Sequence, residues 1–75
     1  MQRKKYDYSV LIGKIIEKLG SREKLAELMG CNSATLSRKL HNKSQFNQNE
    51  ISTICEILNE EVENIPTLFY KIKVR

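Results

Sequence analysis

The stretch REKLAELMGCNSATLSRKL, residues 22–40, constrains the fold of this chain more than any other part of the sequence. A helix-turn-helix joins two short helices through a turn of three or four residues, and it needs a small residue where the helices touch and a turn former between them. Ala26 and Gly30 supply these two. Apolar residues stand where two steeply crossing helices each need inward side chains: Leu25, Leu28, Met29, Cys31 and Leu36. Because any small helical bundle can show this spacing, the residues on either side of the stretch are needed to decide whether it is a helix-turn-helix.

Capping residues and apolar periodicity predict helices along nearly the whole chain. We expect helices over residues 8–19, 22–29, 33–41 and 48–58, with N-caps at Asp7, Ser21, Asn32 and Asn47. The first helix has one apolar face, formed by Tyr8, Leu11, Ile12, Ile15, Ile16 and Leu19. A further helical piece is expected near residues 66–69, because Pro66 suits a first turn and pushes Ile65 toward extended geometry.

These elements predict an all-α fold, a compact bundle of four to five helices that contains the helix-turn-helix. We divide the chain into a basic N-terminal arm (1–6), a helix-turn-helix domain that binds DNA (7–69) and a C-terminal tail (70–75). The tail alternates apolar and basic residues as YKIKVR, a period of two that suits a short strand. Such a strand needs a partner within the chain or on a second copy. A frayed terminus is the open alternative.

The length and the charge distribution limit the classes of function. A chain of 75 residues makes one domain with little room for a large active-site cavity. No apolar run approaches the ~20 residues that span a bilayer, so we expect a soluble, cytoplasmic protein. Residues 1–45 hold ten Lys and Arg against four Asp and Glu, whereas residues 46–75 hold three against five. The basic half attracts a polyanion, unless it is simply a solvated face.

The sequence shows no residue pattern typical of an active site or a metal site. His41 is the only histidine, and the two cysteines, Cys31 and Cys55, stand 24 residues apart without further metal-ligand spacing. Neither paired carboxylates nor a glycine-rich phosphate loop nor a Ser-His-Asp arrangement is visible. We therefore expect no enzyme activity, no cofactor, no metal and no small-molecule substrate.

The segment LAELMGCNSATLSRKLHNK resembles the DNA-binding segment of phage repressors and Cro-like proteins, the lambda-repressor-like or XRE-type family. The pattern of that family is met at Ala26, Gly30, Cys31 and Leu36 and departs at Lys39, where an apolar residue is usual. We expect Leu40 to take over that packing, while Lys39 lays its stem along the core edge and keeps its charge at the surface. The resemblance implies a phage or prophage transcription regulator that binds operator DNA as a homodimer, with helix 33–41 in the major groove.

Candidate contact residues follow from the faces of helix 33–41 and from its neighbours. If Leu36 and Leu40 face inward, the opposite face carries Ala34, Ser37, Arg38 and His41. The candidates for base contacts are Ser33, Ala34, Ser37 and Arg38, although Arg38 also suits a phosphate contact. The candidates for phosphate contacts are Ser21, Arg22, Asn42, Lys43, Ser44 and Gln45. The candidates for dimerisation are Leu68, Phe69, Tyr70, Ile72 and Val74.

Other interpretations stay open. The basic residues of the arm either follow the DNA backbone or minor groove, or lack fixed structure. The chain is either a short Cro-like protein or part of a longer repressor. The alternative function is an antitoxin-like protein-interaction module with secondary DNA binding, which would show an exposed apolar patch in its C-terminal half.

Overall fold

Local capping signals set where the helices of this chain begin and end. The computed structural model describes residues 5–72, which form helices α1 (Ser9–Leu19), α2 (Arg22–Met29), α3 (Ser33–Leu40), α4 (Gln48–Leu58), the 3-10 helix η1 (Val62–Asn64) and α5 (Ile65–Phe69). This architecture confirms the predicted all-α class, and the described residues contain no strand.

Three of the four predicted N-caps are confirmed. Ser21 and Asn32 each accept a hydrogen bond from a backbone N–H in the first turn of the next helix, at 3.1 and 2.6 Å. Asn47 and Glu50 form a complete capping box, with the two hydrogen bonds at 2.8 and 2.9 Å. Because each of these side chains satisfies an N–H that the helix itself leaves unpaired, the helix starts are encoded locally.

Three boundaries differ from the prediction, and the smallest difference is that α3 ends at Leu40 instead of residue 41. Tyr8, and not Asp7, occupies the N-cap position of α1, although the Asp7 side chain still accepts from the Ser9 N–H at 2.9 Å. Ile65 was expected to be extended, but its φ of −57° and ψ of −46° are helical. The preceding 3-10 turn leads directly into α5, and burial of the α5 side chains outweighs the local effect of the following proline.

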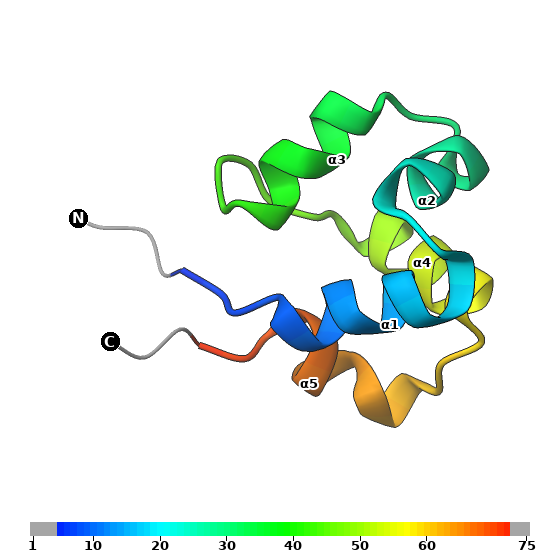
Figure 1. Ribbon diagram of the computed structural model, residues 1–75. Helices are drawn as coiled ribbons and strands as arrows, with labels where there is room; N and C mark the ends of the chain where they lie inside the picture. Colours follow the sequence, from blue (N-terminus) through cyan, green and yellow to red (C-terminus); the bar gives the residue numbers. More distant parts are fainter. Residues whose placement is uncertain (1–4, 73–75) are drawn as a thin grey trace.

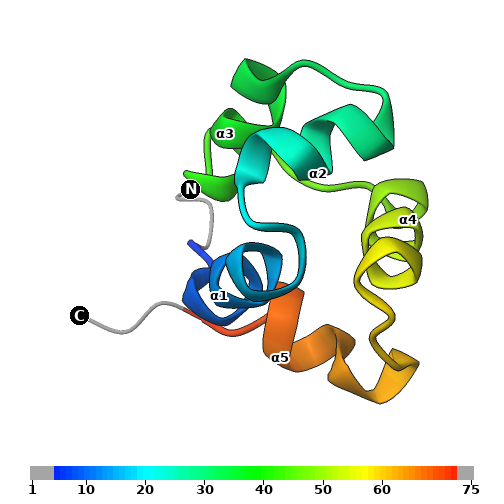
Figure 2. The same cartoon turned by 45° about the vertical axis from the view of Figure 1, so that its right-hand side comes forward.

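α2 and α3 lie on one side of the molecule, and α1 and α5 lie on the other (Figures 1 and 2). α3 packs on α2, which in turn contacts α1 and α4. Every α-helix contributes to a single core, which consists of Tyr8, Leu11, Ile15, Leu25, Ala26, Leu36, Leu40, Ile51, Ile54, Cys55, Leu58, Leu68 and Phe69. Ile16 and Leu28 were expected to face inward, but they are 47% and 48% exposed, so the apolar faces of α1 and α2 are narrower than predicted.

An ion pair joins α3 to the beginning of α4. The Lys39 ammonium lies 2.5 Å from Glu50 Oε2, and the two side chains are only 13% and 24% exposed. Lys39 was expected to keep its charge at the surface, but the charge lies at the partly exposed edge of the core, where the Glu50 carboxylate compensates it. Burial alone would raise the pKa of Glu50, but hydrogen bonds from Lys39 and from the Asn47 N–H, together with the Lys39 charge, lower it below its ordinary value.

The two ends of the described chain meet beside the loop after α3. Tyr6 and Ile72 form an isolated antiparallel bridge, and the Asp7 N–H donates to the Lys71 carbonyl at 2.7 Å. On its other side, Tyr6 is held by the side-chain amide of Asn42, which accepts from the Tyr6 N–H at 2.8 Å and donates to the Tyr6 carbonyl at 2.9 Å.

The predicted strand of the tail is wrong over residues 70–72, and residues 73–75 lie outside the described part. Within the described residues, the tail has a partner in the chain, and the pairing there is one isolated bridge. Toward the beginning of the tail, the pairing stops because the partner segment turns into α1 at Ser9, two residues after Asp7.

Replacing Asn42 by Gly tests whether its side chain holds the N-terminal segment. Asn42 has a φ of 64°, a left-handed conformation that Gly adopts without strain, so the variant loses the two hydrogen bonds to Tyr6 and little else. We expect a loss of about 1 kcal/mol of stability and faster hydrogen exchange at the Tyr6 amide. Asn59→Gly is the matched control, because Asn59 is the other left-handed Asn, with a φ of 56°. Unchanged exchange at Tyr6 in the Asn42 variant would contradict this account.

Replacing Glu50 by Gln tests the ion pair through its pH dependence. Gln keeps an acceptor for the capping box but removes the charge, so we expect a loss of about 1 kcal/mol at neutral pH. Because the native pKa of Glu50 is lowered, its stabilisation is complete above the unfolded pKa of about 4.3 and is lost as the pH falls through the native pKa. Urea unfolding from pH 7 to pH 3 should show wild type and variant converging at acid pH. A difference that persists there would refute the assignment, and Lys39→Met should reproduce the loss at neutral pH.

Candidate nucleic-acid interface

The turn between α2 and α3 sets how α3 is presented. Gly30 ends α2 with a φ of 75°, in the left-handed region where a residue with a Cβ is strained. Its N–H donates to carbonyls of the last turn of α2, and the Cys31 N–H donates to the Ala26 carbonyl at 3.0 Å. Asn32 then caps α3. The chain thus passes from α2 to α3 within Gly30, Cys31 and Asn32, which is the short turn that the sequence predicts.

Three side chains fix the rotation of α3 about its own axis. Leu36 and Leu40 are buried in the core, at 1% and 5% exposure. Lys39, between them, reaches Glu50 at the start of α4. Because all three anchors lie toward the interior, the opposite face of α3 is left to solvent.

Three of the four candidate base-contact residues, Ala34, Ser37 and Arg38, lie on that face, and Ser33 flanks it at the N-terminal end of α3. Ser33, Ala34 and Arg38 are exposed, and Ser37 is half-buried. Among the described residues, the Arg38 guanidinium has no ion-pair partner. It is therefore the one long cationic side chain of this face with its donors available.

His41, at the end of the same face, folds back on α3. Its Nδ1 lies 2.8 Å from the Ser37 carbonyl and 3.4 Å from Ser37 Oγ. A carbonyl oxygen only accepts, so Nδ1 carries the proton and donates to Ser37. The imidazole leaves Nε2 on its outer edge.

A shallow hollow connects the beginning of α2 with the exposed face of α3. It is lined by Arg22 and Glu23 from α2 and by Ser33, Ala34 and Ser37 from α3. The structure thus brings one predicted phosphate contact next to three predicted base contacts. Sequence reasoning missed Glu23, whose position next to Arg22 in the first turn of α2 was the available signal.

The other candidate phosphate contacts differ in their exposure and in the hydrogen bonds that their side chains already make. Lys43 and Gln45 are exposed, and Ser44 is half-buried. Ser21 Oγ accepts from the helix and keeps its hydroxyl proton for a second partner. Asn42 uses its side-chain amide on Tyr6, so only its remaining N–H and its backbone are left for DNA.

The dimerisation candidates divide into two groups. Leu68 and Phe69 are core residues, at 1% and 2% exposure, so their assignment to a dimer interface is corrected: α5 turns them inward. Tyr70 and Ile72 are 49% and 45% exposed, and Val74 lies outside the described residues. Tyr70 also packs its ring edge-to-face on Tyr6.

Residues 5–72 contain neither a membrane-spanning helix nor a candidate metal site. No helix in this range has the length and apolar character needed to cross a bilayer. No group of three or more His, Cys, Asp and Glu side chains in the same range is arranged to hold a metal ion.

Comparisons with known proteins place these features in a family. No curated protein matches the chain. Among solved structures, the chain is similar to the modulator of repression (MOR) of the temperate bacteriophage TP901-1 from Lactococcus lactis, solved in solution. The two share 38% identity over 93% of this chain and 95% of that one, with a TM-score of 0.78. A family model described as "Protein of unknown function (DUF739)" matches residues 4–72. The chain therefore belongs to the DUF739 family and is a homologue of a phage modulator of repression.

Proposed function

We propose that this chain is a phage-type transcription regulator that binds operator DNA with α3 in the major groove. The observation that carries the proposal is the outward face of α3, which presents Ser33, Ala34, Ser37 and Arg38 while the opposite face is fixed in the core. The resemblance of the motif to the lambda-repressor-like family and the name of the homologue, a modulator of repression, support the same assignment.

The side chains of α3 differ in what they would read. Arg38 suits two hydrogen bonds to guanine O6 and N7, a contact worth about 1–3 kcal/mol of discrimination. Ala34 suits the methyl group of thymine, whereas Ser33 and Ser37 both donate and accept and so discriminate weakly. We therefore expect Arg38 to dominate sequence preference.

Residues around α3 would hold the DNA backbone. Arg22 at the start of α2 and Lys43 in the loop after α3 flank the recognition face on both sides, with Ser21, Ser44 and Gln45 beside them. Glu23 lines the same hollow as Arg22 and reduces the positive potential there. Because phosphate contacts carry the salt dependence of binding, we expect a modest salt slope.

Homodimerisation would let two copies of α3 read half-sites about 34 Å apart. With Leu68 and Phe69 in the core, Ile72 is the main exposed candidate of the tail, because Tyr70 already packs on Tyr6. The proposal predicts a palindromic operator and a dimer at the concentrations that saturate it.

A protein-interaction module is the second candidate function, and one observation favours it. Val62, Tyr70 and Ile72 are exposed apolar side chains in the C-terminal part of the chain, at 77%, 49% and 45%. A modulator of repression could act through such a surface on another regulatory protein. Val62→Asp discriminates the two: it should leave DNA binding unchanged, and it should abolish regulation only if a protein contact at Val62 is required.

Selection from a randomised duplex pool tests the DNA proposal as a whole. We expect enrichment of a short palindromic motif and an affinity that falls as salt rises. If sequencing of the retained duplexes shows no enriched motif, the DNA-binding proposal fails.

Arg38→Ala tests the base-reading role. We expect the preference to relax at one base step in each half-site, with a loss of about 1–3 kcal/mol on the selected duplex and little change on unrelated DNA. Arg38→Lys is the control, because it keeps the charge but loses the two-pronged geometry. If Arg38→Ala instead weakens binding to all duplexes alike and Arg38→Lys restores that affinity, Arg38 contacts phosphate and the assignment is wrong.

Lys43→Ala tests the phosphate-contact role. We expect similar weakening on all sequences and a salt slope, measured as log affinity against log salt, that falls by about one. Lys24→Ala, which removes an exposed lysine of α2 that pairs with Glu27 at 3.6 Å, is the comparison and should change the slope less. A change in base preference in the Lys43 variant would contradict this role.

A further inference from the structure

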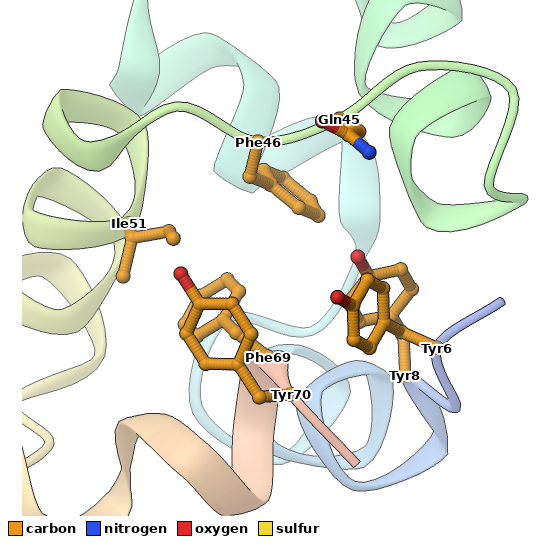
Figure 3. Close-up of a pocket in the computed structure, with 7 residues that line it drawn as sticks. All are labelled: Tyr6, Tyr8, Gln45, Phe46, Ile51, Phe69 and Tyr70. Carbon is orange, nitrogen blue, oxygen red and sulfur yellow. The ribbon is translucent and has the colours of Figure 1, made fainter. Parts of the chain in front are cut away.

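All five aromatic side chains of the chain surround one cavity. The sequence has three Tyr, two Phe and no Trp, and Tyr6, Tyr8, Phe46, Phe69 and Tyr70 line the same hollow together with Gln45 and Ile51 (Figure 3). The hollow has a volume of about 150 Å³. It shares no residue with the hollow between α2 and α3.

The five rings are linked by three edge-to-face contacts and one tilted contact into a nearly closed circle. The ring centroids of Tyr70 and Tyr6 are 5.9 Å apart, those of Tyr6 and Tyr8 6.2 Å, and the contacts of Phe46 with Tyr8 and with Phe69 are each 5.4 Å. Phe69 and Tyr70, at the two ends of this series, are consecutive residues. A small group in the hollow therefore meets several rings at once.

The circle has a buried floor and an open rim. Tyr8 and Phe69 are 7% and 2% exposed, whereas Tyr70 is 49% exposed and Tyr6 and Phe46 are half-buried. In Figure 3, Tyr6 and Tyr8 lie on one side of the hollow, Phe69 and Tyr70 on the other, and Phe46 and Gln45 above them. Rings at the rim remain available to a ligand without unfolding of the core.

The lining residues are polar in part but carry no charge. Three phenol hydroxyls and the Gln45 amide border the space. Burial raises the pKa of the Tyr8 hydroxyl, and the neighbouring Tyr6 and Tyr70 raise it further, so the phenol of Tyr8 is neutral at physiological pH. The cavity thus offers ring surfaces and neutral oxygen acceptors without any carboxylate.

We propose that this cavity binds the guanidinium group of an arginine side chain presented by a partner protein. A guanidinium is planar, stacks on aromatic rings and is weakly hydrated, and its N–H groups can donate to the phenol oxygens and to the Gln45 carbonyl. A lysine ammonium is strongly hydrated and would find no carboxylate to offset its dehydration. An apolar side chain would cover the rings but would leave the hydroxyls without new partners.

Titration of the full chain with Nα-acetyl-arginine amide, followed by NMR, tests this site. Because every Tyr and Phe ring of the chain borders the cavity, all the Tyr and Phe ring signals of the spectrum report on it. We expect saturable shifts of the Tyr6, Phe46 and Tyr70 ring signals, with weak binding of about 10 mM. The capped amides of citrulline, a neutral isostere of arginine, and of leucine are the comparison ligands and should bind at least about threefold more weakly.

Variants at the rim locate the binding. Tyr70→Leu should weaken arginine binding about two- to fivefold, whereas Tyr70→Phe keeps the ring and should weaken it less. Leu28→Ala, at a side chain on α2 that is also about half exposed, should have no effect. Tyr6→Leu repeats the test from the opposite side of the rim, so the result does not depend on one variant being folded.

Three results would overturn the proposal: no saturable shift with the arginine amide, equal binding of the citrulline or leucine amide, or undiminished binding in both rim variants. DNA binding through α3 uses none of Tyr6, Tyr70 or Phe46, so failure here would leave the proposed function untouched.

Discussion

The carboxylate of Glu50 makes the contact on which the position of α3 depends. One oxygen closes the capping box that starts α4, and the other accepts from the Lys39 ammonium of α3. A single side chain therefore connects the beginning of one helix to the flank of another. Burial of Leu36 and Leu40 holds α3 to the core. The ion pair of Lys39 with Glu50 adds a directional contact that limits rotation of α3 about its own axis.

Much of this fold was predictable because its signals are local. Ser21, Asn32 and Asn47 cap the helices that follow them, and Gly30 ends α2, since each acts within one turn of its own position. Apolar spacing also identified the inward side of α3. The partners of Lys39 and Asn42 were not predictable, because Glu50 is 11 and Tyr6 is 36 residues away in sequence. The same holds for the aromatic circle, in which residues near both ends of the chain meet Phe46.

The Asn42 contact links the two surfaces of the molecule. Asn42 follows the C-cap of α3 and has a left-handed backbone conformation. Its side chain binds the backbone of Tyr6, whose ring lines the aromatic cavity. The N-terminal segment is therefore held between the end of α3 and the tail. The contact between Asn42 and Tyr6 thus connects the end of α3 to the rim of the aromatic cavity.

The central claim is that the rotation of α3 presents Ser33, Ala34, Ser37 and Arg38 to DNA. Mapping of backbone amide shifts on addition of the duplex enriched by selection tests it most directly. The account predicts that the largest shifts fall on these four residues and on Arg22, while the amides of α4 and α5 stay nearly unchanged. Shifts concentrated on α4 and α5, with α3 unaffected, would contradict it.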